Sequence, residues 1–210
     1  MNIAIVLSGG TGSRLNAFLP KQYIKVGGED IITRCLRTLY EHSEISFVHI
    51  VAAEEWREEI RREQERIPAS LEKFRGFSRP GLNRQMSICN ALADIEKYAK
   101  ASDTVLIHDA ARPYLTNELI SRIFQAMKGH AGAMPVLPMK DTVYYSDNGK
   151  TVSRLLERSC VYAGQAPEAY RFGDYLNVNR VLLPDDIFEA GGLTDELKIY
   201  GAYYVPAVSD

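Results

Sequence analysis

Cysteines, basic blocks and long apolar runs are scarce in this sequence, and each scarcity excludes a class of protein. The three cysteines, Cys35, Cys89 and Cys160, lie far apart, without a CxxC spacing or a nearby pair of histidines. They indicate neither a disulfide framework nor a zinc site, so we expect three buried thiols. The net charge is −2 and the lysines and arginines are dispersed, which argues against duplex nucleic acid as the main partner and leaves small anionic ligands.

A membrane span is also missing, because no apolar run approaches the roughly 20 residues that such a helix needs. Residues 1–7 lack the length and the flanks of a secretory signal. We therefore expect a soluble, cytoplasmic protein. A chain of 210 residues can bury roughly 70% of its unfolded surface, so we expect one domain over residues 1–210 that needs no disulfide or structural metal.

Short apolar runs alternate along the chain with segments in which apolar residues recur at helical spacing. Strands are predicted at 3–7, 47–51, 74–77, 105–107 and 203–205. Helices are predicted at 30–39, 54–67, 83–100, 116–128, 170–182 and 194–200. This alternation is typical of a doubly wound α/β fold with a mostly parallel sheet.

The alternation of strand and helix patterns ends after residues 133–136. Two segments of strand character, 141–145 and 151–154, flank a turn that contains Asn148-Gly149. An Asn-Gly pair between such segments is a strong hairpin signal. We expect a β-arm, at about 138–163, that protrudes from the sheet.

A glycine-rich turn follows the first predicted strand, at the edge where doubly wound sheets bind their ligands. It comprises Ser8, Gly9, Gly10, Thr11 and Gly12. Glycines there let backbone N–H groups approach a phosphate chain, although a tight turn without a ligand explains them equally well. The dinucleotide fingerprint would need glycine where Leu15 stands, and no Gly-Lys-Ser/Thr P-loop is present, so both common phosphate loops are disfavoured.

Two cations, Arg14 and Lys21, follow the glycines seven residues apart. An arginine can bind phosphate oxygens through two parallel hydrogen bonds, and a lysine adds a compact positive charge. Together they suit a phosphorus atom that gains negative charge as it is attacked, which makes them the candidate catalytic residues. The alternative is a pair of solvated surface cations.

Four separated blocks resemble one known family. Residues 9–14 with 20–23 resemble the nucleotidyltransferase signature of the methylerythritol phosphate cytidylyltransferases, and the segments 81–87, 108–113 and 141–142 agree with that family in order and spacing. The resemblance covers nearly the whole chain. It implies a Rossmann-like nucleotidyltransferase fold and the transfer of CMP from CTP to a polyol phosphate, with release of pyrophosphate.

The resemblance also implies roles for single residues. CTP would lie on Ser8 to Gly12 and on Gly81, Arg84 and Ser87, of which Gly81 and Ser87 help to select cytosine. Asp109 would hold Mg²⁺; a turn or capping aspartate is the alternative. The acceptor would be held by Arg112, Thr142, Arg154 and Arg158. The β-arm would reach across a homodimer into the partner's site, whereas an ordinary hairpin charge is the alternative for Arg154.

Three departures from the family pattern stand near the C-terminal end. Ala166-Pro167-Glu168 replaces the usual Thr-Pro-Gln, so a hydroxyl expected near the acceptor phosphate is missing. Residues 162–165, preceded by Arg158, resemble the ribitol phosphate cytidylyltransferases more closely, which leaves open whether Arg154 or Arg158 grips the acceptor. The sequence ends at Asp210, where the family continues into an Asn-x-Lys segment. We therefore expect either a truncated sequence or, in a complete one, weak acceptor binding or another group in place of that lysine.

The acceptor favoured by residues 108–112 and 194–196 is 2-C-methyl-D-erythritol 4-phosphate, with ribitol 5-phosphate second. Two other classes stay open. One is a nucleotide-binding module without catalysis. The other is a Rossmann-type reductase, disfavoured by Leu15, in which Glu54 or Glu55 would bind a ribose.

Overall fold

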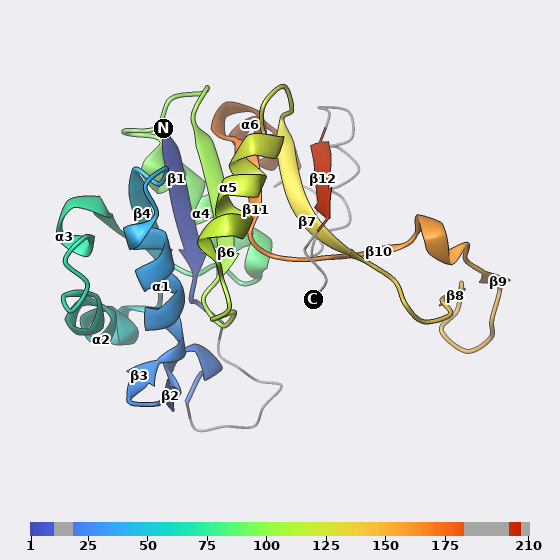
Figure 1. Ribbon diagram of the computed structural model, residues 1–210, viewed down its shortest axis with the longest axis horizontal. Helices are drawn as coiled ribbons and strands as arrows, with labels where there is room; N and C mark the ends of the chain where they lie inside the picture. Colours follow the sequence, from blue (N-terminus) through green and yellow to red (C-terminus); the bar gives the residue numbers. More distant parts are fainter. Residues whose placement is uncertain (11–18, 183–201, 207–210) are drawn as a thin grey trace.

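The computed structural model describes residues 1–10, 19–182 and 202–206. Its centre is a mostly parallel eight-stranded sheet with the order β10-β7-β11-β6-β1-β4-β5, in which β12 also pairs with β7 (Figure 1). The strands are β1 Asn2–Leu7, β4 Phe47–Val51, β5 Phe74–Ser78, β6 Thr104–Asp109, β7 Gly132–Pro138, β10 Tyr162–Gly164, β11 Glu168–Arg171 and β12 Ala202–Pro206. Only β10 and β11 run antiparallel to their neighbours in this sheet.

The apolar runs become strands because both faces of the sheet are covered. Along β1, Ile3 and Ile5 belong to one core cluster, while Ala4 and Val6 belong to the other. Successive side chains of a strand point to opposite faces, so a strand buried on both sides must be apolar throughout. The prediction of a doubly wound, mostly parallel sheet is confirmed.

Helices cover the two faces separately. The cluster that contains Ala4 and Val6 takes side chains from α1 Ile31–Glu41, α2 Glu54–Gln64 and α5 Asn117–Ala126. The cluster on the other face takes them from α4 Arg84–Ile95 and α6 Phe172–Leu182. The remaining short elements are α3 Ser70–Lys73, the 3-10 helix Lys21–Tyr23 and the strand pair β2 Lys25–Val26 and β3 Glu29–Asp30.

Three strands of the sheet, β7, β10 and β11, are not among the predicted strands. The helix predicted at 170–182 begins only at Phe172, because Glu168–Arg171 form β11 between β6 and β7. A four-residue strand carries little periodicity of its own, and its place depends on neighbours far away in the sequence. The helix predicted at 194–200 lies outside the described residues, whereas the final strand is confirmed as β12.

The β-arm extends away from the sheet (Figure 1). Its tip is the antiparallel pair β8 Tyr144–Tyr145 and β9 Arg154–Leu155, shorter than the predicted hairpin, and it returns through a 3-10 helix, Arg158–Cys160, into β10. Several large apolar side chains on the arm are exposed. Cys160 is exposed as well, so the prediction of three buried thiols holds for Cys35 and Cys89 and is wrong for Cys160.

No helix within the described ranges has the length and apolarity to cross a bilayer. A chain of polar groups, of which His49 and Ser78 are buried, links β4, β5 and α4. His49 Nε2 lies 2.7 Å from Ser78 Oγ, which donates to Asp94 Oδ2 at 2.6 Å, and Tyr98 Oη lies 3.3 Å from His49 Nδ1. Burial lowers the pKa of His49 to about 4, from an ordinary value of 6.5.

This histidine predicts a loss of stability in mild acid. The unfolded chain binds a proton at His49 below pH 6.5, but the folded chain does so only near pH 4, so the stability that depends on neutral His49 is lost as the pH falls through that window. We expect up to about 1.4 kcal/mol of unfolding free energy per pH unit from this one group. Urea denaturation at pH 7, 6 and 5 gives the unfolding free energy at each pH. This free energy should fall less steeply with falling pH in His49→Gln than in the wild type; an equal pH dependence would contradict the assignment.

Candidate active site

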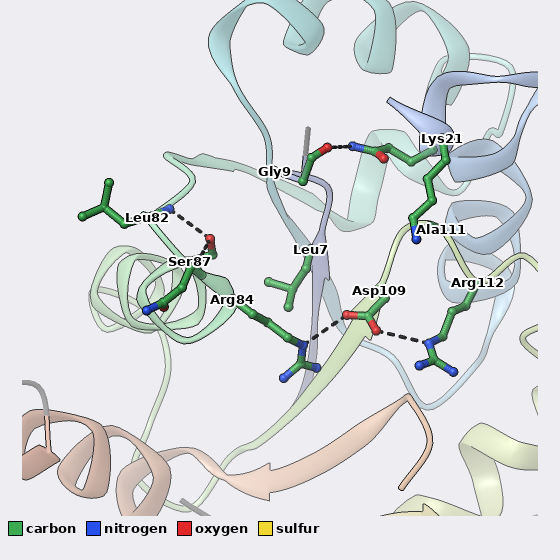
Figure 2. A pocket seen from close by; sticks show the side chains of 13 residues that line it. Leu7, Gly9, Lys21, Leu82, Arg84, Ser87, Asp109, Ala111 and Arg112 are labelled. Carbon is green, nitrogen blue, oxygen red and sulfur yellow. Dashed lines mark hydrogen bonds and ion pairs between the residues drawn. The ribbon is translucent and has the colours of Figure 1, made fainter. Parts of the chain in front are cut away.

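A pocket of about 640 Å³ opens at the carboxyl ends of β1 and β6 (Figure 2). These two strands pair in parallel with Leu7 opposite Asp109, so the segments that follow them leave the sheet at the same level. The pocket is lined by Leu7, Gly9, Gly10, Lys21, Gln22, Gly81, Leu82, Asn83, Arg84, Ser87, Asp109, Ala111 and Arg112. It therefore occupies the edge where a doubly wound sheet binds its ligands.

The glycine turn after β1 is held from behind by the 3-10 helix. Gln22 Nε2 donates to the carbonyl oxygens of Ser8 and Gly10, at 3.0 and 2.8 Å. Ser8 is buried, and its Oγ lies 2.8 Å from Tyr23 Oη, so its hydroxyl supports the turn from beneath. A Cβ atom on Gly9 would lie 2.5 Å from Pro80 Cβ, which leaves room for glycine alone.

The turn before α4 forms the opposite wall. Asn83 caps the helix, because its Oδ1 accepts from the backbone N–H of Met86 at 2.8 Å. Ser87 Oγ accepts from the N–H of Gly81 at 2.9 Å and donates to the carbonyl of Asn83 at 2.9 Å. A Cβ atom on Gly81 would lie within 2.3 to 2.7 Å of atoms of Met86 and Ser87. This wall is therefore closely packed and fixed by hydrogen bonds.

Asp109 lies between two arginines on the floor of the pocket (Figure 2). Arg84 Nε donates to Asp109 Oδ1 at 3.3 Å, and Arg112 Nε donates to Asp109 Oδ2 at 3.2 Å. Arg84 also donates through Nη2 to Glu168 Oε1 at 2.8 Å. Lys21 extends toward this centre from the far wall (Figure 2), so three cations face one carboxylate in the pocket itself.

His108 fixes the loop that carries Arg112. Burial lowers the pKa of His108 to about 4, so its ring is neutral near pH 7. Its Nε2 lies 3.0 Å from the carbonyl oxygen of Arg112; since a carbonyl only accepts, Nε2 carries the hydrogen. Nδ1 is buried and has no hydrogen-bond partner in the part of the chain that the structure describes.

The acidic groups of the chain differ in their fitness for a metal ion. Asp30, Glu59 and Glu63 bring carboxylate oxygens within 4.8 Å of one another, but Lys25 Nζ lies 3.0 Å from Asp30 and 3.5 Å from Glu63. An ammonium group already pairs with that cluster and offsets part of its charge, and the cluster is not part of the pocket. Asp109 faces the pocket and offers one carboxylate, the number that Mg²⁺ commonly takes from a protein when phosphate oxygens supply further ligands.

Eight of the residues predicted for the site line one pocket, namely Gly9, Gly10, Lys21, Gly81, Arg84, Ser87, Asp109 and Arg112. Thr11, Gly12 and Arg14 lie outside the described residues.

Three predicted residues, Thr142, Arg154 and Arg158, belong to the arm and do not line the pocket of their own chain. Arg154 lies over the ring of Tyr145, 4.7 Å from its centroid, and Arg158 Nη1 donates to the carbonyl of Lys140 at 2.8 Å.

Two side chains that touch the arginines of the site are not among the predicted site residues. Gln165 Oε1 accepts from Arg112 Nη1 at 3.3 Å, and Glu168 accepts from Arg84. Both residues lie in the segment that departs from the family pattern. That departure is the sequence feature that could have indicated them as site residues.

Comparison with known families gives one match over residues 2–199, to the family described as IspD, 2-C-methyl-D-erythritol 4-phosphate cytidylyltransferase. A ribitol-5-phosphate cytidylyltransferase of Vibrio parahaemolyticus is 30% identical over 210 residues, which cover 100% of this chain and 87% of the relative. A 2-C-methyl-D-erythritol 4-phosphate cytidylyltransferase of Rubrobacter xylanophilus is 34% identical over 174 residues, which cover 81% of this chain and 70% of the relative.

Solved structures agree on the fold. A 4-diphosphocytidyl-2C-methyl-D-erythritol synthase of Anaerococcus prevotii superposes with a TM-score of 0.81 at 22% identity, covering 98% of this chain and 86% of that one. The Francisella tularensis 2-C-methyl-D-erythritol 4-phosphate cytidylyltransferase gives 0.76 at 21% identity, covering 99% of this chain and 91% of that one. This chain is a nucleotidyltransferase and belongs to the 2-C-methyl-D-erythritol 4-phosphate cytidylyltransferase (IspD) family.

Proposed function

We propose that the pocket transfers CMP from CTP to the phosphate of a small polyol phosphate. An acceptor phosphate oxygen attacks the α-phosphorus of CTP in line, a new P–O bond forms, and the bond to the pyrophosphate oxygen breaks, so pyrophosphate leaves. No side-chain nucleophile is needed. The observation that carries the proposal is the convergence of the glycine turn, the start of α4 and three cations on one carboxylate.

The chain's own groups align the reactants and balance their charge. Gly81 and Ser87, on the tightly packed wall, suit the edge of the cytosine ring, while Gly10, where a Cβ atom would meet no other atom within 4 Å, leaves the backbone open to the phosphates. Lys21, with Arg14, stabilises the charge that develops at the α-phosphorus. Asp109 would hold Mg²⁺, which neutralises triphosphate charge when bound. Arg112 and Thr142 contribute to the acceptor site.

Replacing Lys21 by alanine should separate chemistry from binding. We expect Lys21→Ala to lower kcat about a hundredfold or more, because a donor to the transition-state charge is lost, while the Kd for CTP changes much less. Pyrophosphate release and calorimetric titration with CTP measure the two effects. Lys128→Ala, an exposed lysine at the end of α5, is the matched control. Unchanged turnover in Lys21→Ala would refute the role, and CTP binding without turnover in the wild type would favour a non-catalytic nucleotide-binding module.

Two acceptors are candidates for this site. The match of residues 108–112 to the methylerythritol branch and the Rubrobacter relative favour 2-C-methyl-D-erythritol 4-phosphate. Gln165 and the Vibrio relative favour ribitol 5-phosphate, because that acceptor has one more hydroxyl group for a side-chain amide beside Arg112. The ratio of kcat/KM for the two acceptors, measured on the same preparation, decides between them.

Gln165→Ala tests the origin of that selectivity. We expect it to lower kcat/KM for ribitol 5-phosphate about tenfold, the effect of one lost hydrogen bond, and to change kcat/KM for 2-C-methyl-D-erythritol 4-phosphate less. Gln125→Ala, on the exposed side of α5, is the control. Equal losses with both acceptors would show that Gln165 does not select between them.

We further propose that two copies pair through the β-arm and that Arg154 reaches the partner's acceptor site. The arm exposes Tyr144, Val152, Leu155 and Tyr162, whose burial against a second copy would remove apolar surface from water. Arg158 already donates to a backbone carbonyl within the arm, which leaves Arg154 as the arginine expected to act across the dimer.

A heterodimer of two inactive variants tests this arrangement. If one subunit carries Lys21→Ala and the other Arg154→Ala, one of the two sites combines both defects and the other is intact, so about half of the wild-type activity should return. If both residues act within one subunit, neither site is intact. The purified heterodimer would then be as inactive as each variant alone.

A further inference from the structure

Arg84 contacts two carboxylates, of which Asp109 lines the pocket and Glu168 does not. Its Nη2 lies 2.8 Å from Glu168 Oε1, whereas its Nε lies 3.3 Å from Asp109 Oδ1. Burial opposes the charge on Arg84, but Glu168 and then Asp109 outweigh that effect and raise its pKa above the ordinary value. The guanidinium is therefore charged, and its shorter contact is to the carboxylate that does not line the pocket.

Glu168 is held rigidly in this position. Its backbone belongs to β11, in register with Ile107 of β6, and its Oε2 accepts from Tyr170 Oη at 2.7 Å. Tyr170 is buried, and its ring stacks on Tyr175 at a centroid distance of 4.2 Å. Both oxygens of Glu168 thus have donors, and one of those donors is fixed in the core.

A divalent cation at Asp109 would compete with two arginines. Both carboxylate oxygens accept from arginines in the structure, and each guanidinium that stays there holds electron density and positive charge against an arriving cation. A displaced guanidinium with no other partner would stay near Asp109 and compete for it. Arg84 has such a partner in Glu168.

We propose that Glu168 is a positioning residue that retains Arg84 beside the pocket and so leaves Asp109 available to a divalent cation. This inference rests on the proposed function, since it takes Asp109 as the carboxylate that meets the metal ion. Glu168 acts through Arg84 and need not touch either substrate. Its negative charge also offsets part of the positive charge around the pocket, which would otherwise repel a metal ion.

The test is binding, measured without turnover. Glu168→Gln keeps the shape of the side chain and removes its charge, so Arg84 should turn toward Asp109 and the pocket should become more positive. We expect the Kd for Mn²⁺ in the presence of CTP, followed by electron paramagnetic resonance, to rise about tenfold. The Kd for CTP in EDTA should fall or stay unchanged. Damage to the fold would instead weaken both affinities together.

Three further variants complete the experiment. Tyr170→Phe should shift both affinities in the same directions by a smaller factor, and it decides the question if Glu168→Gln does not fold. Glu168→Asp should retain most of the wild-type Mn²⁺ affinity, and Glu118→Gln, an exposed carboxylate on α5, should have no effect.

The two possible failures are distinguishable. If the wild type binds Mn²⁺ with CTP and a folded Glu168→Gln binds it equally well, or loses both affinities together, this inference alone is wrong. If the wild type neither binds Mn²⁺ with CTP nor transfers CMP, the proposed function is wrong and this inference is overturned with it.

Discussion

The parallel pairing of β1 with β6 is the constraint on which the pocket depends. It sets Leu7 opposite Asp109, so the glycine turn after one strand begins at the same edge of the sheet as Asp109, the last residue of the other strand. Both strands are apolar and covered on both faces, which makes a shift of this register costly. The rigid sheet thereby places backbone N–H groups and a carboxylate within one cavity, as nucleotide transfer requires.

Charge balance then decides what the cavity can bind. Lys21, Arg84 and Arg112 line it together with Asp109, and Glu168 lies behind Arg84. In the proposed function this site binds a polyphosphate, and each arginine of the pocket is restrained: Arg84 by Glu168 and Asp109, and Arg112 by Asp109 and Gln165. Restrained donors lose little freedom when a ligand arrives and need not reorganise as charge develops in the reaction. The polar contacts of the site therefore orient the donors that meet a phosphate ligand, in addition to providing the positive charge that attracts it.

Sequence patterns predicted the parts of the fold that are locally determined. The apolar run at 3–7 and the Asn148-Gly149 turn each carry their own signal. Strand β11 was missed because its pairing with β6 and β7 is a long-range property. For the same reason Glu168, 84 positions from Arg84, could be noted as a departure but not as a partner. The pocket residues themselves came from a resemblance spread over four blocks, and the structure brings eight of them together.

In the proposed function this pocket joins CMP to a polyol phosphate. Phosphorus-31 magnetic resonance of the protein with CTP, Mg²⁺ and each acceptor follows every phosphorus atom in one sample. We expect the triphosphate signals to give way to free pyrophosphate and to the two coupled resonances of a cytidine diphosphate ester, with one acceptor strongly preferred. Triphosphate that persists with both acceptors, or that is hydrolysed to CDP and inorganic phosphate, would contradict it.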